Sequence, residues 1–190
     1  MSYDLHLFRP QPGKDLTEAA LASLEDDSEN ASPGAKDPEG EKRKKAMSEA
    51  LRKANPGLSE FKDEEEADAL GEAAEEARRQ WQPIELNGPD DGNGIQITLY
   101  DDTAAVTVPY WHKEQAARRV MGEIWEYLEV LQSQGGFRTY DPQIEKVLDL
   151  AADRDAVLGA YATGVGHTDD IGRRETEGAE KPSKPWWKFW

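Results

Sequence analysis

Three histidines are the chain's first candidates for acid-base chemistry or metal binding, because the 190 residues contain no cysteine. His6 lies in an alternating segment, His112 at a predicted helix start, and His167 in a glycine-bearing stretch. None of them lies three or four residues from another, the spacing that places two ligands on one helix face. We therefore expect no metal site and no cofactor. The missing cysteine also excludes a thiolate nucleophile and a disulfide.

Two adjacent carboxylates, Asp101 and Asp102, stand between two alternating apolar segments. Paired carboxylates can act as general acid and base, but adjacent aspartates at a hairpin tip typically form the turn. We expect a turn that presents acidic surface to a partner. An alternative is a small enzyme whose site combines Asp101 with Tyr110, His112 and Tyr140, which would require the fold to bring these groups together.

The tripeptide Tyr110-Trp111-His112 lies where a predicted strand passes into a predicted helix. Side chains at the end of a sheet can line a crevice, and a histidine can titrate near neutrality. We expect these residues to contact a partner, with Trp111 capping the core as the alternative. The run from Gly164 to His167 lacks the preceding strand and following helix of a nucleotide-binding loop, so it is interpreted as a linker.

The run from Lys184 to Trp190 is rich in aromatic residues and lysine. Exposed aromatic side chains usually mark a contact. Three occupants fit this run: the chain's own sheet, a protein groove in which tryptophan serves as an anchor, and a membrane interface. The predicted partner-binding residues of this run are Trp186, Trp187, Phe189 and Trp190.

The chain is acidic, with a formal net charge of -16, and 33% of its residues are charged. Such a charge disfavours nucleic-acid binding, which depends on lysine and arginine at the phosphates, and favours a basic protein partner. The basic run Lys42 to Lys45 and the acidic segment Asp63 to Arg79 are interpreted as outward-facing helix surfaces. Because no leader-like start or membrane-spanning run is present, we expect a cytoplasmic protein.

A predicted β-hairpin from Ile95 to Trp111, followed at once by a helix from His112 to Gln134, defines the fold class. Apolar residues alternate along both arms of the hairpin, and the helix has an apolar stripe at three- and four-residue spacing. We expect the stripe to pack on the sheet. The other predicted elements are a strand at Tyr3–Phe8, a short helix from Asp15, helices at Glu41–Ala54, Asp63–Trp81 and Ala156–Ala162, and strands at Pro83–Leu86 and Phe137–Tyr140.

This order of elements is that of a split β-α-β unit, so the predicted fold is a ferredoxin-like α+β sandwich with an antiparallel sheet and helices on one face. We expect one domain over residues 1–163 with a charged helical insertion at about 26–81. Residues 164–190 are predicted to be a flexible tail ending in the aromatic motif.

Three short motifs also resemble a group of small bacterial α+β proteins, some of them similar to antitoxin-type immunity proteins. These are the strand opening with Ser2-Tyr3-Asp4-Leu5, the hairpin ending in Tyr110-Trp111, and the run Gly136 to Asp141 after the long helix. The resemblance implies a non-enzymatic protein that neutralises a toxin or effector through its acidic surface. The alternative is a membrane-peripheral adaptor that uses the tryptophan-rich run.

Overall fold

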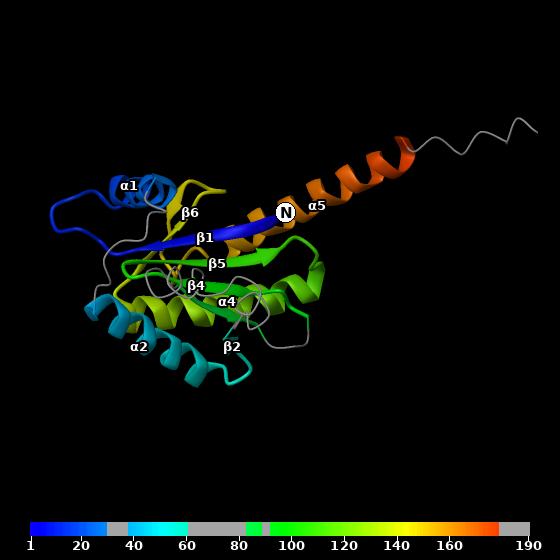
Figure 1. The fold of residues 1–190 in the computed structure, drawn as a ribbon. Helices are drawn as coiled ribbons and strands as arrows, with labels where there is room; N and C mark the ends of the chain where they lie inside the picture. Colours follow the sequence, from blue (N-terminus) through cyan, green and yellow to red (C-terminus); the bar gives the residue numbers. More distant parts are fainter. Residues whose placement is uncertain (30–37, 61–82, 89–91, 179–190) are drawn as a thin grey trace, which may run out of the picture.

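The computed structural model describes residues 1–29, 38–60, 83–88 and 92–178, with the backbone alone for 26–29 and 169–178. Within these residues the fold is α+β, an open antiparallel sheet of seven strands in the order β2-β3-β4-β5-β1-β6-β7 with helices packed against it (Figure 1). The strands are β1 (Ser2–Phe8), β2 (Ser59–Glu60), β3 (Ile84–Asn87), β4 (Gln96–Leu99), β5 (Thr103–Pro109), β6 (Arg138–Asp141) and β7 (Lys146–Val147). The helices are α1 (Leu16–Glu29), α2 (Pro38–Ala54), α4 (Glu114–Gly135) and α5 (Arg154–Gly178).

The predicted hairpin is confirmed as β4 and β5. Ile97 is paired with Val106, and the Tyr100 amide donates to the Thr103 carbonyl 3.0 Å away across the turn. Side chains alternate between buried and half-buried along both strands, as expected when one face is against the core. β5 ends at Pro109, which has no amide hydrogen to continue the ladder.

The predicted long helix is confirmed as α4, and its apolar stripe is the centre of the main core. Gly136 ends the helix in the left-handed conformation at φ 69°, which a glycine adopts without the steric cost of a Cβ atom. Helices α2 and α5 contribute to the same core, including Leu51 and Tyr161. The buried residues of α4 are Ala117, Val120, Met121, Ile124, Trp125, Tyr127, Leu128, Leu131 and Gly135.

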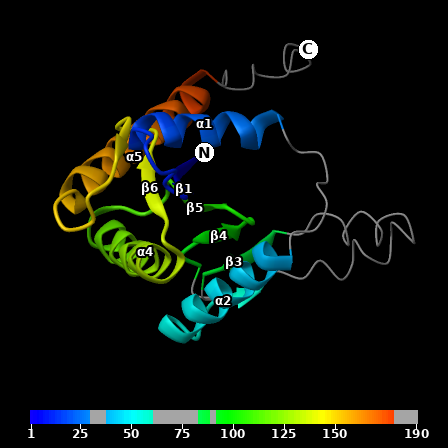
Figure 2. The ribbon, with the colours of Figure 1, turned by 90° about the vertical axis from the view of Figure 1, so that its left-hand side faces the viewer.

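Helix α1 corrects the expectation that helices cover only one face of the sheet. Leu7 points into the main core beneath α2 and α4, whereas the next residue, Phe8, points to the opposite face and packs on Ala19 and Ala20 of α1. Figure 2 shows α1 on the other side of β1 from α2 and α4. Because β1 carries apolar side chains on both faces, both must be covered.

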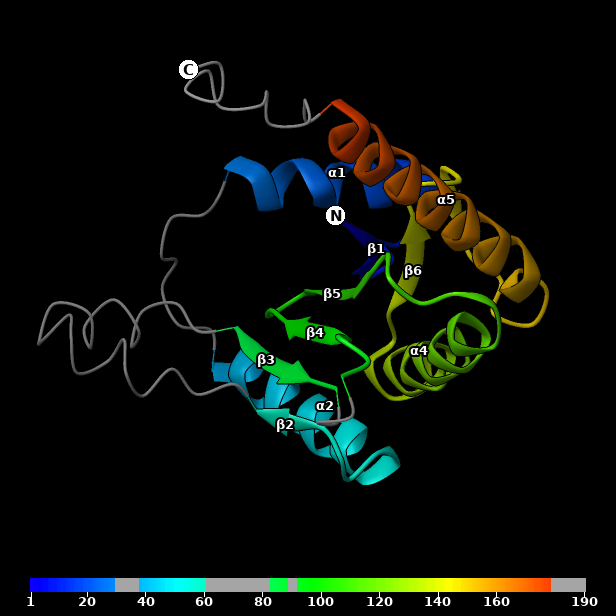
Figure 3. The same cartoon turned by 90° about the vertical axis from the view of Figure 1, so that its right-hand side faces the viewer.

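The start of α1 and the end of α5 are also defined by the structure. Asp15 caps the start of α1, because its carboxylate accepts the Thr17 amide at 2.9 Å. The prediction that helical structure ends after Ala162 is wrong, since α5 continues to Gly178 and buries Val165. Figure 3 shows the first turns of α5 beside α4, and Figure 1 shows its last turns leading away from the sheet.

Two short strands were not predicted, because two-residue strands show no periodicity. β2 pairs with β3 and β7 pairs with β6 at the two edges of the sheet. The predicted acidic helix at 63–81 lies outside the described residues.

We expect Ile124→Ala to lower the free energy of unfolding by about 2–5 kcal/mol, since Ile124 is fully buried and its truncation leaves a cavity under the sheet. Urea unfolding followed by circular dichroism measures this loss. Arg119→Ala, on the exposed face of the same helix, is the control and should change stability by less than about 0.5 kcal/mol. Equal effects of the two changes would contradict the packing of α4.

Candidate functional site

The predicted acidic hairpin tip is bound to basic side chains of the same chain. Asp101 Oδ1 lies 2.9 Å from Lys44 Nζ, and Asp102 Oδ1 lies 3.1 Å from Arg43 Nη2 and 3.6 Å from Arg9 Nε. The tip therefore links the β4–β5 turn to α2 and to the segment after β1. These two carboxylates are engaged within the molecule.

Lys44 corrects the prediction that the basic residues of α2 all face solvent. Its side chain is only 5% exposed and makes a second ion pair with Glu41 at 2.6 Å. Burial disfavours the ammonium ion, but the hydrogen bonds to Glu41 and Asp101 outweigh burial and raise the pKa of Lys44. Gly40 allows this close approach, because a Cβ there would stand 2.7 Å from Asp101 Cγ. A buried lysine thus depends on the turn's carboxylate.

Asp101→Asn should therefore destabilise the fold by about 1–3 kcal/mol, because it removes one of the two anions from a buried cation. Asp102→Asn is the matched control. Its carboxylate is 67% exposed, so loss of its ion pairs should cost less than about 1 kcal/mol. Chemical denaturation at 50 mM salt compares the two, and equal losses would refute the special role of Lys44.

The three junction residues Tyr110, Trp111 and His112 point to different surroundings. The Tyr110 ring is half-buried and stacks on Tyr161 of α5 at 5.5 Å between centroids. The Trp111 side chain is 60% exposed and lies over Gly94, where a Cβ would stand 2.6 Å from the indole. Of the three, Trp111 presents the largest free surface to a partner.

His112 has two competing neighbours at one nitrogen. Its Nε2 lies 2.6 Å from the Asn93 carbonyl oxygen and 2.8 Å from Nε1 of Trp111. A carbonyl oxygen only accepts and an indole N–H only donates. A protonated Nε2 therefore donates to Asn93, and an unprotonated Nε2 accepts from Trp111. The tautomer of His112 decides which of the two segments it holds.

The structure does not bring together the groups of the alternative enzymatic site. Asp101 and Tyr110 lie at opposite ends of β5, which at seven residues is about 23 Å long. Tyr140 lies on the other face of the sheet, packed beside Phe8 and α1. Among the described residues, no group of three or more His, Asp or Glu side chains is arranged to hold a metal ion.

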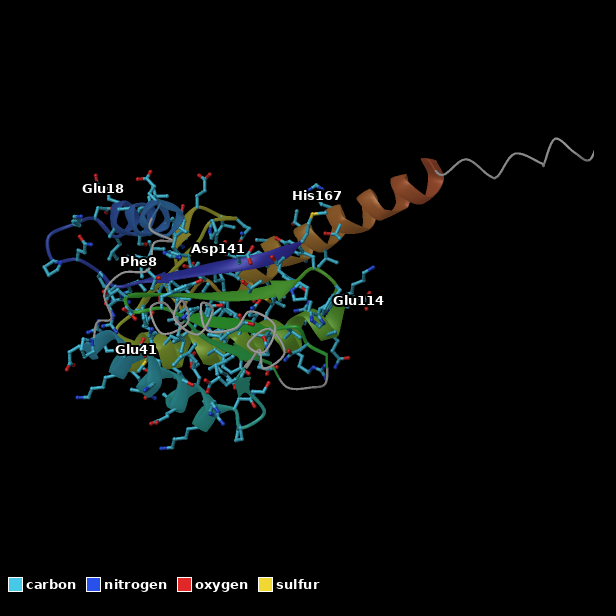
Figure 4. All side chains as sticks on the ribbon, in the orientation of Figure 1. Phe8, Glu18, Glu41, Glu114, Asp141 and His167 are labelled. Atoms are coloured by element: carbon cyan, nitrogen blue, oxygen red, sulfur yellow. The ribbon has the colours of Figure 1, made fainter. Side chains whose placement is uncertain are left out.

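Asp141 is a buried carboxylate that sequence reasoning missed. It is fully buried on β6 and accepts a hydrogen bond from the Tyr3 hydroxyl of β1, beside which it lies in Figure 4. Burial raises the pKa of Asp141, although bonds from Tyr3 and the Gln143 amide act in the opposite direction. Because Asp141-Pro142 has the sequence of a turn, only the tertiary fold identifies the hydrogen bond between Tyr3 and Asp141.

A second missed network surrounds Glu123 on α4. Its carboxylate accepts hydrogen bonds from Asn55 at 2.9 Å, from Tyr127 at 2.7 Å and from Asn93 at 3.2 Å. Burial and the neighbouring Glu123 raise the pKa of Tyr127, so its hydroxyl stays protonated as a donor. The network joins the end of α2 and the loop before β4 to α4.

The pair formed by His6 and Ser23 has the composition of a nucleophile and its base but not their geometry. Ser23 Oγ donates to the Ala20 carbonyl at 2.8 Å, so it accepts from Nε2 of His6, also at 2.8 Å. A catalytic base would instead accept the hydroxyl proton. Burial lowers the pKa of His6 to about 4, which makes it a weak base. The pair joins α1 to β1.

His6 predicts a pH dependence of stability. The unfolded imidazole binds a proton near pH 6.5 and the folded one only near pH 4, so acid favours the unfolded chain. We expect up to about 3 kcal/mol of stability to be lost between pH 6.5 and 4. His6→Gln should remove this loss while still donating to Ser23. Urea unfolding across this range tests the difference between the two proteins, and parallel curves would contradict it.

Among the described residues, an open groove along α4 is a candidate binding site. It has a volume of about 660 Å³ and runs between the end of α2, the exposed side of α4 and the loop before α5. Half-buried Val130 and Leu150 contribute apolar surface, and exposed Glu126, Glu129 and Asp149 contribute carboxylates. The remaining lining residues are Ala54, Gln132, Ser133 and Ala151.

The carboxylates of this groove have little internal compensation. No lysine, arginine or histidine is among the described residues that line it. Within the described part of the chain, Glu126 and Glu129 make no ion pair, in contrast to Asp101 and Asp102. Other exposed acids, such as Glu18 and Glu114, lie on separate parts of the molecule (Figure 4). The groove therefore combines apolar surface with uncompensated negative charge.

The predicted aromatic contacts at Trp186, Trp187, Phe189 and Trp190 lie outside the described residues. None of the described helices is long and apolar enough to cross a membrane. Comparison of the chain with protein-family models, with curated proteins and with solved structures gives no match.

Proposed function

We propose that the protein is a non-enzymatic binding module that holds a basic, partly apolar segment of a protein partner in the α4 groove. The observation that carries this proposal is the position of Glu126, Glu129 and Asp149 around the half-buried side chains of Val130 and Leu150. Apolar side chains of a partner helix would cover the two aliphatic residues, and flanking lysines or arginines would reach the carboxylates.

The charge of the protein would mainly speed its encounter with a basic partner and select against acidic ones. A net charge of -16 attracts cationic partners over several ångströms, and an acidic groove rejects acidic ones. Exposed ion pairs add little to affinity in water. Most of the binding energy would therefore come from covering Val130 and Leu150, so binding should be strong only for segments that carry both charge and apolar anchors.

The resemblance to immunity-like proteins suggests the class of partner, and we propose a basic toxin or effector. The groove supports this proposal because it offers negative charge outside the internal ion pairs of the hairpin tip. Trp111 supplies a second contact, since it is 60% exposed at another part of the molecule. In this mechanism the module acts by occlusion, covering a basic surface of the partner.

We also propose that the four central strands form a ferredoxin-like split β-α-β unit. Three observations support it: the strand order β4-β5-β1-β6, the place of α2 between β1 and β4 in the sequence, and the place of α4 between β5 and β6. β2, β3 and β7 then extend this unit at its two edges. In this arrangement α2 and α4 lie side by side on one face, and the groove lies on the side of α4 exposed to solvent.

A fluorescein-labelled amphipathic peptide of leucine and lysine tests the proposed function by fluorescence anisotropy at 50 mM salt. We expect the wild-type protein to bind it and Glu126→Lys/Glu129→Lys to bind at least ten-fold more weakly, since the groove then repels the peptide. Glu18→Lys/Glu114→Lys changes the net charge equally at distant exposed sites and is the control. Equal weakening by both variants, or no binding by the wild type, would overturn the proposal.

A further inference from the structure

The sequence itself contains a segment that fits the α4 groove. Residues 184–190 combine Lys184 and Lys188 with three tryptophans and Phe189, whereas the groove combines carboxylates with aliphatic surface. We propose that the groove of one molecule binds residues 184–190 of a second copy, an inference that rests on the proposed function. Lysines then face Glu126 and Glu129, and aromatic rings cover the aliphatic surface.

The course of α5 favours an occupant from a second copy. Arg154 at the start of α5 lies beside Gly122 of α4, and the Tyr161 hydroxyl accepts the His112 amide before α4 begins. α5 therefore runs back along α4 toward the first residues of that helix. The groove extends in the opposite direction, toward Ser133.

The distances keep the first residues of this run away from the groove of its own chain. α5 has 25 residues and is about 37 Å long, so Gly178 lies at least that far from the groove. Leu150, which lines the groove, lies in the turn before α5, where the Asp153 amide donates to the Asp149 carbonyl. It is therefore farther from Gly178 than the first residue of α5 is. The eight residues from Ala179 to Trp186 span at most about 29 Å. Neither Lys184 nor Trp186 can reach the groove of its own chain while α5 is intact.

A second copy removes this restriction. The last turns of α5 lead away from the sheet (Figure 1), so the end of this helix lies away from the groove of its own molecule. Two molecules can exchange these segments, so that each groove is filled and the assembly closes as a dimer. Each contact is small, so one bound segment alone would hold the two molecules weakly. Once the first segment is bound, the second binds within the same complex, which strengthens the dimer. Self-association should thus depend on concentration and on salt.

Sedimentation velocity of the full chain from 1 to 200 µM tests the inference. We expect the wild type to dimerise at 50 mM salt and to dimerise more weakly at 500 mM salt, where the charge contribution is screened. Glu126→Lys/Glu129→Lys and Lys184→Glu/Lys188→Glu should each weaken dimerisation at least ten-fold. Glu18→Lys/Glu114→Lys is the control, with the net-charge change of the groove variant. Circular dichroism verifies that every variant is folded.

Mixing and combining the variants tests how the surfaces pair. A mixture of the groove variant and the tail variant should form a one-to-one complex, because one wild-type groove and one wild-type tail remain. A chain carrying all four reversals should dimerise again. A wild type that is monomeric at 200 µM, or a dimer that the groove reversal leaves intact, would overturn the inference.

The labelled leucine-lysine peptide separates this inference from the proposed function. If the peptide binds the groove of the wild type while the chain remains monomeric, the exchange is wrong and the proposed function stands. If the peptide fails to bind, the proposed function is overturned. If the peptide competes with self-association, both are supported, since the two ligands then share one groove.

Discussion

The structure depends on the burial of β1 on both faces and along both edges. β1 pairs with β5 over all seven residues and with β6 over its last three, so it is an inner strand of the sheet. Tyr3, Leu5 and Leu7 enter the main core, and Phe8 enters the core beneath α1. A slip of one residue would move each set to the wrong face. The register of this strand therefore sets the positions of α1, α4 and α5 relative to one another.

The acidic composition of the chain serves different purposes at different places. Asp101 neutralises Lys44, which is almost completely buried, and so it contributes to folding. Asp141 is itself buried and positions the Tyr3 hydroxyl between two strands. Glu126 and Glu129 have no ion-pair partner in the described part of the chain and remain available to a cation. Net charge alone predicts a basic partner but does not distinguish these roles.

Part of the candidate site could be predicted from local sequence, and part could not. The position of Tyr110, Trp111 and His112 at a strand-to-helix junction follows from the periodicity on either side. Their different directions do not, since Tyr110 is drawn inward by Tyr161 and Trp111 is placed over Gly94. The α4 groove combines residues near positions 54, 130 and 150. No local pattern connects segments so far apart, because their proximity is produced by the packing of α2 and the loop before α5 on α4.

The sequence by itself determined the hairpin, the long helix, the α+β class and the two faces of β1, because side-chain periodicity is a local property and burial requires it. Tertiary structure alone decided that α1 covers the second face, that Lys44 is buried, and that α5 continues past Ala162. Each of these depends on a partner distant in sequence: Phe8 beneath α1, Asp101 beside Lys44, and Tyr110 against Gly164 of α5. The free energy of such contacts is defined only once the chain has folded.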